Sequence, residues 1–138
     1  VAFLSLSTAW LSEGYLLCGR LEEASAVADR ALDLSKKHKE RGHQAWALKL
    51  LGDITLRRDW PNIELAEVHY RQALALSQEL GMRPLQAHCH VGLGRICGAM
   101  GSPDQARAQF SAAVDLYRSM EMTLWIDRAD AALGNIGM

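Results

Sequence analysis

Two sets of small and apolar residues recur along this 138-residue chain with the same period. Leucine followed by glycine or serine recurs at intervals of 40, 42 and 40 residues, at Leu11-Ser12, Leu51-Gly52, Leu93-Gly94 and Leu133-Gly134. Alanines recur in step, and a second alanine follows seven residues later in each unit: Ala24, Ala66 and Ala106, then Ala31, Ala73 and Ala113. Two independent patterns with one period indicate a repeat architecture, in which each unit buries its apolar face against the next.

The segments between glycines and prolines are rich in residues that favour helices, and runs of β-branched residues are absent. The clearest start signal is Ser102-Pro103-Asp104-Gln105, which predicts Ser102 as N-cap and Gln105 as its capping-box partner. The sequence therefore predicts an all-α fold of about seven helices without a sheet. We expect them at residues 3–18, 21–38, 43–58, 62–80, 84–99, 103–119 and 123–135.

The recurring small residues predict how neighbouring helices cross. Alanines seven residues apart lie on one stripe of a helix, so they let two helix axes approach closely. A glycine inside a helix costs about 1 kcal/mol relative to alanine. We therefore expect a neighbouring backbone to pass close to Gly52 and Gly94. The residues between the paired alanines, Ala28, Tyr70 and Phe110, are expected to pack as knobs on a neighbouring helix.

At these positions the chain resembles the tetratricopeptide repeat family. The family pattern is matched in the third unit by His90, Leu93-Gly94, Cys97, Ala106, Phe110 and Ala113, and more loosely in the two units before it. The resemblance implies a right-handed α-solenoid of antiparallel helix pairs, forming one domain over 1–138. Its units are expected at about 5–41, 43–82 and 84–121, followed by a terminal or capping helix at about 123–138.

The repeats differ from the usual pattern of that family in length. Their period of about 40 exceeds the usual 34, and Lys36, Gln78 and Arg118 stand where the family has a proline. We therefore expect the second helix of each unit to extend by about a turn. The chain is similar in this respect to C-terminal arrays of bacterial multidomain ATPase-type signalling regulators. With no initiator methionine and apolar residues at both ends, it is expected to be a fragment of a longer protein.

Composition argues against several classes of partner and site. Fifteen basic and 16 acidic residues give a formal charge of −1, which disfavours binding to nucleic acid or to an anionic membrane. No stretch reaches the length of apolar residues that spans a bilayer. Three cysteines without close spacing, Cys18, Cys89 and Cys97, favour a reducing compartment, so we expect a cytoplasmic protein without a disulfide framework.

No arrangement of residues predicts catalysis, and the sequence predicts a protein that is not an enzyme and needs no cofactor. His88 and His90 point about 200° apart on a helix and cannot share one metal ion, so no metal site is expected. Gly92-Leu93-Gly94 lacks the third glycine of a dinucleotide-binding loop and lies within a predicted helix. Both motifs are better explained by helix packing.

The resemblance also implies a concave groove lined by the first helix of each unit. Groove positions carried over from the family are Leu6, Glu13, Trp46, Lys49, Asp53, His88, Val91, Arg95, Arg128 and Asn135. The simplest alternative is that these are only solvated helix positions. If they form a groove, Leu6, Trp46 and Val91 are expected to anchor a bound protein segment, and Lys49, Asp53 and Arg95 to orient it by charge.

The expected function is that of a non-catalytic protein-interaction scaffold that binds a peptide, as the regulatory arm of a larger signalling protein. One alternative is a small-molecule-sensing arm of a transcriptional or signalling regulator. A second alternative is self-association, as a homodimer through exposed terminal helices. Trp125 and Ile126 belong to this apolar end and are expected to lack a neighbouring repeat.

Overall fold

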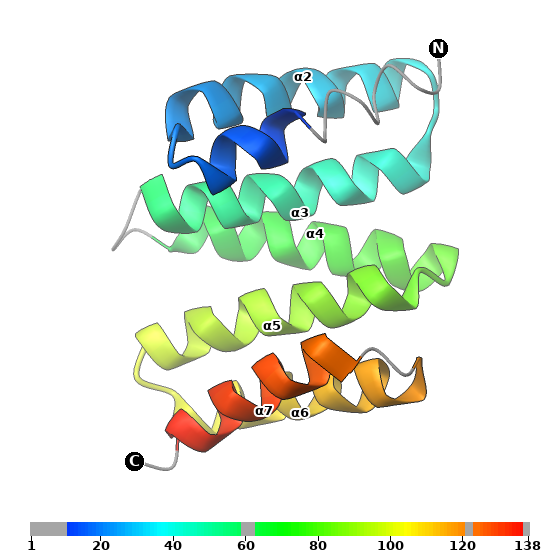
Figure 1. The fold of residues 1–138 in the computed structure, drawn as a ribbon. Coiled ribbons are helices and arrows are strands. Elements are labelled where there is room, and N and C mark those ends of the chain that lie inside the picture. Colours follow the sequence, from blue (N-terminus) through cyan, green and yellow to red (C-terminus); the bar gives the residue numbers. More distant parts are fainter. Residues whose placement is uncertain (1–10, 59–62, 121–122, 137–138) are drawn as a thin grey trace.

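The computed structural model describes residues 11–58, 63–120 and 123–136, and these residues are helical apart from short connections (Figure 1). After a helical segment at residues 11–17 come α2 (Leu21–Lys37), α3 (Arg41–Arg58), α4 (Glu64–Leu80), α5 (Arg83–Ala99), α6 (Pro103–Ser119) and α7 (Thr123–Ile136). The predicted all-α fold of seven helices is confirmed for this part of the chain. Helix ends differ from the prediction by one or two residues, as at α3, which begins at Arg41 instead of residue 43.

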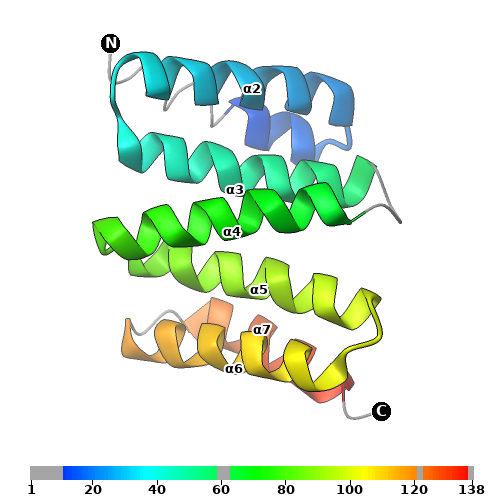
Figure 2. The same cartoon turned by 180° about the vertical axis from the view of Figure 1, so that it is seen from behind.

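Consecutive helices pack against each other in antiparallel pairs and form two layers. Segment 11–17, α3, α5 and α7 form one layer, which faces the viewer in Figure 1. Helices α2, α4 and α6 form the second layer, seen from its own side in Figure 2. Contacts join every consecutive pair from α2 to α7, and α3 also contacts α5 within its layer. This arrangement places the first helices of successive units side by side.

The recurring alanines lie where the repeat pattern predicts, in the contacts between helices. Ala24, Ala66 and Ala106 are fully buried, and so are the alanines seven residues after each of them. Cys89 and Cys97 are buried beside them in apolar clusters, as expected of small hydrophobic residues. The second helices run past Lys36, Gln78 and Arg118 by only one or two residues, which is less than the extension of about a turn that the missing proline predicted.

An aromatic ring lies against the recurring glycines, so the expectation of a close backbone is wrong. A Cβ atom added at Gly52 would lie 2.9 Å from the Tyr70 ring, and one added at Gly92 would lie 2.5 Å from the same ring. At Gly94 the Phe110 ring takes this place, at 2.8 Å. In the first unit Ser12 replaces glycine, and its hydroxyl donates to the Ala24 carbonyl at 2.7 Å. Glycine is needed where a neighbouring helix inserts an aromatic side chain.

Backbone hydrogen bonds cap the C-terminal ends of several helices. Gly19, Gly81 and Gly101 adopt positive φ directly after helices, where the following amides bond back to the last carbonyls. Lys39 occupies the same position after α2 with a φ of 57°, the left-handed region that favours glycine. Ser102 is the N-cap of α6 and Pro103 its first residue, as predicted, but the Ser102 side chain makes no capping bond. The predicted capping box with Gln105 is therefore wrong.

A spanning helix needs about 20 predominantly apolar residues. None of the helices in the described ranges combines sufficient length with sufficient apolar character to cross a bilayer.

Candidate functional site

A cavity of about 250 Å³ opens on the layer formed by segment 11–17, α3, α5 and α7. Its wall has an apolar part and a polar part. The apolar part consists of Leu16, Leu17, Leu50, Leu56, Val91, Gly92, Ala129 and Ala132. The polar and aromatic part consists of Glu13, Lys49, Asp53, Arg57, Tyr70, His88, Arg95, Tyr117, Trp125 and Arg128. Tyr70 and Tyr117 reach this cavity from α4 and α6 in the layer behind.

Most of the predicted groove residues surround this one cavity. The members that line it are Glu13, Lys49, Asp53, His88, Val91, Arg95 and Arg128. Trp46 is outside the lining, with its ring centre 6.0 Å from that of His88. Leu6 lies outside the described residues, as does the side chain of Asn135. That these side chains bind a partner stays a prediction.

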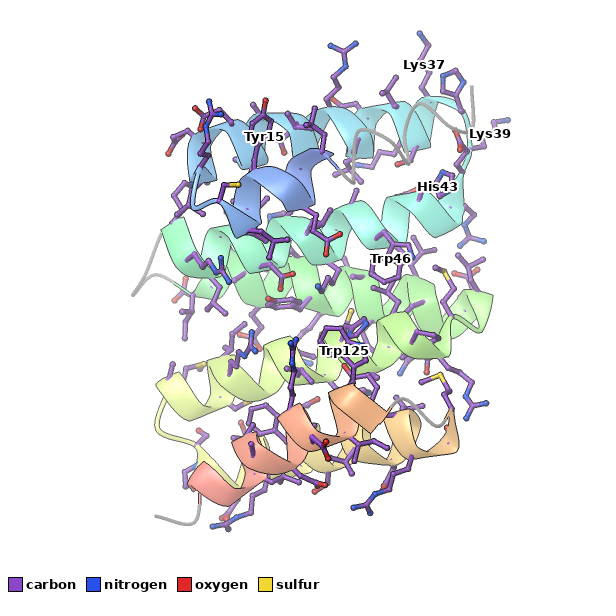
Figure 3. All side chains as sticks on the ribbon, viewed as in Figure 1. Tyr15, Lys37, Lys39, His43, Trp46 and Trp125 are labelled. Atoms are coloured by element: carbon purple, nitrogen blue, oxygen red, sulfur yellow. The ribbon has the colours of Figure 1, made fainter. Side chains whose placement is uncertain are left out.

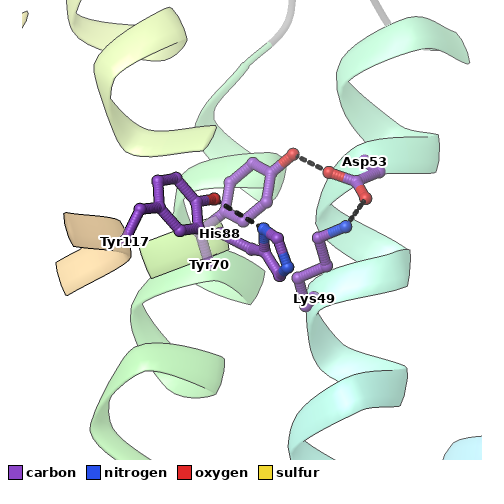
Figure 4. Close-up of polar contacts among 5 residues, drawn as sticks. All are labelled: Lys49, Asp53, Tyr70, His88 and Tyr117. Atoms are coloured by element: carbon purple, nitrogen blue, oxygen red, sulfur yellow. Dashed lines mark hydrogen bonds and ion pairs between the residues drawn. The ribbon is translucent and has the colours of Figure 1, made fainter. Parts of the chain in front are cut away.

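The charges of Lys49 and Asp53 are satisfied within the protein. Lys49 Nζ lies 2.7 Å from Asp53 Oδ2, one helical turn away on α3, and both side chains are mostly shielded from solvent (Figure 4). The Tyr70 hydroxyl donates to the other carboxylate oxygen, Oδ1. Burial raises the pKa of Tyr70 well above its ordinary value, and the nearby Asp53 charge adds to this effect. These two ionic groups therefore form a closed network, which reduces their availability to a partner.

His88 forms a second internal contact in the cavity. Its Nδ1 and the Tyr117 hydroxyl share a hydrogen bond of 2.6 Å (Figure 4). Burial lowers the His88 pKa to about 4, and the Lys49 charge contributes in the same direction while Asp53 opposes it. The imidazole is consequently neutral at pH 7. It contributes a neutral polar surface and an aromatic face instead of a positive charge.

Trp125 adds an aromatic wall that the sequence analysis missed. The centre of its ring lies 4.7 Å from that of the His88 ring and 6.1 Å from that of the Tyr117 ring, on which it stacks. Trp125 is labelled in Figure 3. Ile126 packs against the same apolar cluster as Tyr117. Trp125 and Ile126 are half-buried because α7 packs on α6, and the expectation that they lack a neighbouring repeat stays a prediction. The helical spacing of Trp125 and Arg128, which places both on one face, was the available signal.

The guanidinium of Arg128 lies over the Trp125 ring, 4.9 Å from the ring centre. This cation–π contact holds the side chain at the cavity without neutralising its charge. Arg95 is exposed on α5 at the same cavity. Within the described part of the chain, neither arginine has a hydrogen-bond acceptor or an acidic partner.

The neighbouring histidines point to different partners, in agreement with their spacing. His90 Nδ1 contacts Gln109 Oε1 at 2.7 Å, whereas His88 faces Tyr117. Across residues 11–58, 63–120 and 123–136, no three His, Cys, Asp or Glu side chains come together in a way that would hold a metal ion.

Comparison with known proteins gives one finding on family. No curated protein matches the chain. The family model of the tetratricopeptide repeat matches residues 62–119, the part of the chain that contains α4, α5 and α6. This match includes Gly94, Ala106 and Phe110, on which the sequence resemblance was based, and tetratricopeptide repeats generally mediate protein binding. Residues 62–119 thus match the tetratricopeptide repeat family, and the sequential packing of the described helices is consistent with a helical array of that kind.

Proposed function

We propose that the cavity binds an extended segment of a partner protein, without catalysis. The observation that carries the proposal is the cavity itself, which lies on the layer of first helices and combines apolar walls with charged groups. Its volume of about 250 Å³ suits one or two side chains of a peptide. Pockets for drug-sized molecules generally measure about 300–1,000 Å³. This size favours a protein segment over the small-molecule sensing that the sequence also left open.

The apolar wall supplies the anchoring surface in this proposal. Leu17 is 77% exposed at the cavity and offers its apolar side chain to a bound segment. Val91 and Trp125 continue the apolar surface on α5 and α7. A side chain of the partner that covers these residues removes apolar area from water, at about 25 cal/mol per Å².

Two further proposals concern the domain that the repeats form and the larger protein to which it belongs. We infer that repeats at about 5–41, 43–82 and 84–121 with a terminal helix form one domain that serves as the regulatory arm of a larger signalling protein. The support is the 40-residue period and the resemblance to arrays of bacterial regulators. Self-association through terminal helices is the competing proposal.

The experiment selects 12-residue peptides from a random phage-display library on the wild-type chain. Binding of each enriched peptide is then measured by fluorescence anisotropy. Leu17→Arg introduces a charge at the exposed wall of the cavity, and Leu65→Arg makes the same change at a 46%-exposed position on α4, outside the cavity. We expect enriched peptides to bind wild type and Leu65→Arg equally, and Leu17→Arg at least about tenfold more weakly.

Circular dichroism checks that each variant is folded, and sedimentation velocity measures whether it is a monomer or a dimer. Equal binding of the peptides to both leucine variants contradicts a role for the cavity. A reversible dimer of the wild-type chain that Leu17→Arg abolishes and Leu65→Arg retains supports self-association through the terminal helices instead.

A further inference from the structure

The recurring glycine of α7 differs from its equivalents in α3 and α5. Gly52 and Gly94 are buried, and a Cβ atom added at them would lie 2.9 and 2.8 Å from the aromatic ring of a neighbouring helix. Gly134 is exposed, and a Cβ atom added there would meet nothing within 4 Å among the described residues. Because glycine is unfavourable within a helix compared with alanine, its recurrence at this position indicates space for a ring here too.

Helix α7 packs on the array in the same register as α5. Gly134 follows Gly94 by 40 residues, and Ala129 follows Cys89 by the same interval. Ala129 is buried in a cluster with residues of α6, as Cys89 is with a residue of α4. Figure 1 shows α7 at the end of the described array, beside α6. The face of α7 that corresponds to the α6-facing side of α5 can therefore be identified from this register.

Three exposed residues form this part of α7, which we call the α7 face: Asp127, Asp130 and Gly134. Their equivalents on α5 all meet residues of α6: Ala87 clusters with Ala113, His90 Nδ1 contacts Gln109 Oε1, and Gly94 lies against the Phe110 ring. A helix that packs on the α7 face as α6 packs on α5 would place an aromatic residue at Gly134. Its residue directly before the aromatic one would meet Asp130, and its residue three positions after would meet Asp127.

The two aspartates determine which charge such a helix must carry. Asp127 is exposed and has no ion pair among the described residues. The Asp130 side chain is 45% exposed, and its Oδ2 lies 3.6 Å from Arg118 Nη2, so water screens this pair. Lysine or arginine at both facing positions complements the two carboxylates. These positions are four residues apart, which places them on one side of a helix.

A second copy of α7 does not match this face. Asp130 lies near the middle of α7 (Thr123–Ile136), so an antiparallel pair of α7 helices would set two Asp130 carboxylates against each other. The single aromatic residue of α7, Trp125, contacts His88 and Tyr117 instead of lying on the α7 face. The occupant must therefore be a helix of different composition.

We propose that the α7 face binds a helix of a partner protein, antiparallel to α7. An aromatic residue of this helix fills the space at Gly134, and basic residues directly before it and three positions after it bind Asp130 and Asp127. The α7 face is separate from the cavity of the proposed function, because none of its three residues lines that cavity.

The probe is a fluorescein-labelled peptide of residues 102–120 that carries Gln109→Arg and Ala113→Lys and keeps Phe110 as its aromatic residue. Fluorescence anisotropy measures its binding to the 138-residue chain. Gly134→Leu fills the space on the α7 face, and Gly98→Leu is the matched control at another exposed helical glycine with open space at its Cβ. We expect wild type and Gly98→Leu to bind equally, and Gly134→Leu at least about tenfold more weakly. The peptide with Phe110→Ala is expected to show the same loss on wild type.

An exchange of charges tests the basic residues of the proposed helix. Asp127→Lys is expected to weaken binding of the probe by about fivefold or more, because like charges then face each other. A peptide with Ala113→Glu in place of Ala113→Lys is expected to recover the affinity for this variant. Asp33→Lys makes the same change at an exposed position of α2 and is expected to bind the probe as wild type does.

The remaining outcomes separate this inference from the proposed function. Equal binding to wild type and Gly134→Leu, or no measurable binding to wild type, overturns the inference. Binding that Leu17→Arg abolishes and Gly134→Leu retains assigns the peptide to the cavity, which overturns the inference and supports the proposed function. A wild-type dimer in sedimentation velocity that Gly134→Leu abolishes assigns the α7 face to a second copy and also overturns the inference.

Discussion

The close approach of Tyr70 to two glycines allows a sharp prediction about one methyl group. A Cβ at Gly92 would lie 2.5 Å from two atoms of the Tyr70 ring and 2.8 Å from a third. Carbon atoms in favourable contact are about 3.5–4.0 Å apart, so the ring would have to move by about 1 Å. It has little room to do so, because the ring also lies against Gly52 and its hydroxyl is bound to Asp53. Gly92→Ala therefore forces strain into a fully buried contact.

The expected magnitude follows from two opposing effects. Overpacking of a core contact costs about 1–3 kcal/mol or more. Replacing a helical glycine by alanine recovers up to about 1 kcal/mol of helix propensity. We expect Gly92→Ala to lower the free energy of unfolding by about 1–3 kcal/mol. Gly98→Ala, on the same helix with open space at its Cβ, is expected to raise it by up to about 1 kcal/mol.

The assay is urea unfolding of the whole chain, followed by circular dichroism at 222 nm, with both variants and wild type at one protein concentration. Opposite signs for the two glycines support the ring-to-glycine packing. Equal stabilisation by both alanines would refute it, because the Tyr70 ring would then not occupy the space beside Gly92. Combining Gly92→Ala with Tyr70→Leu is expected to relieve part of the strain, which a non-additive double-mutant cycle detects.

Three further predictions concern the array itself. Ala106→Leu is expected to lower the free energy of unfolding by about 1–3 kcal/mol because Ala106 is fully buried, whereas the change at exposed Ala108 is expected to cost little; urea midpoints compare them. Lys39→Gly is expected to raise the melting temperature by relieving positive φ, with a gain of up to about 1 kcal/mol, and unchanged melting would count against that strain. His88 has a pKa of about 4 when folded, below its ordinary value, so its contribution to stability is complete above pH 6.5 and is lost as the pH falls towards 4. Unfolding curves from pH 7 to pH 4 are expected to fall more steeply for wild type than for His88→Gln, by up to about 3 kcal/mol, and parallel curves would contradict the assignment.

Much of the candidate site could be predicted because groove positions follow the helical period. Glu13, Lys49, Val91 and Arg95 occupy equivalent faces of first helices, and the structure places all four at one cavity. The helical period places Trp125 on the face of Arg128, but its contacts with His88 and Tyr117 depend on how α7 packs against α6. The partners of the charged side chains could not be predicted either. Residue spacing alone does not show that the Tyr70 hydroxyl reaches Asp53 from another helix.

The sequence by itself determined the helices, their number and their order. The repeat of Leu-Gly and of paired alanines specifies which face of each helix is buried, because helical periodicity is a local property of consecutive residues. It also determined that Gly52 and Gly94 need space, but not what fills it.

Only the tertiary structure decided which atoms meet across helices. An aromatic ring fills the space at Gly52 and Gly94, Lys49 pairs with Asp53, and Arg95 and Arg128 find no acceptor among the described residues. These outcomes depend on distances of a few ångströms between side chains on different helices. Such distances follow from the stacking of the whole array, which no single helix specifies.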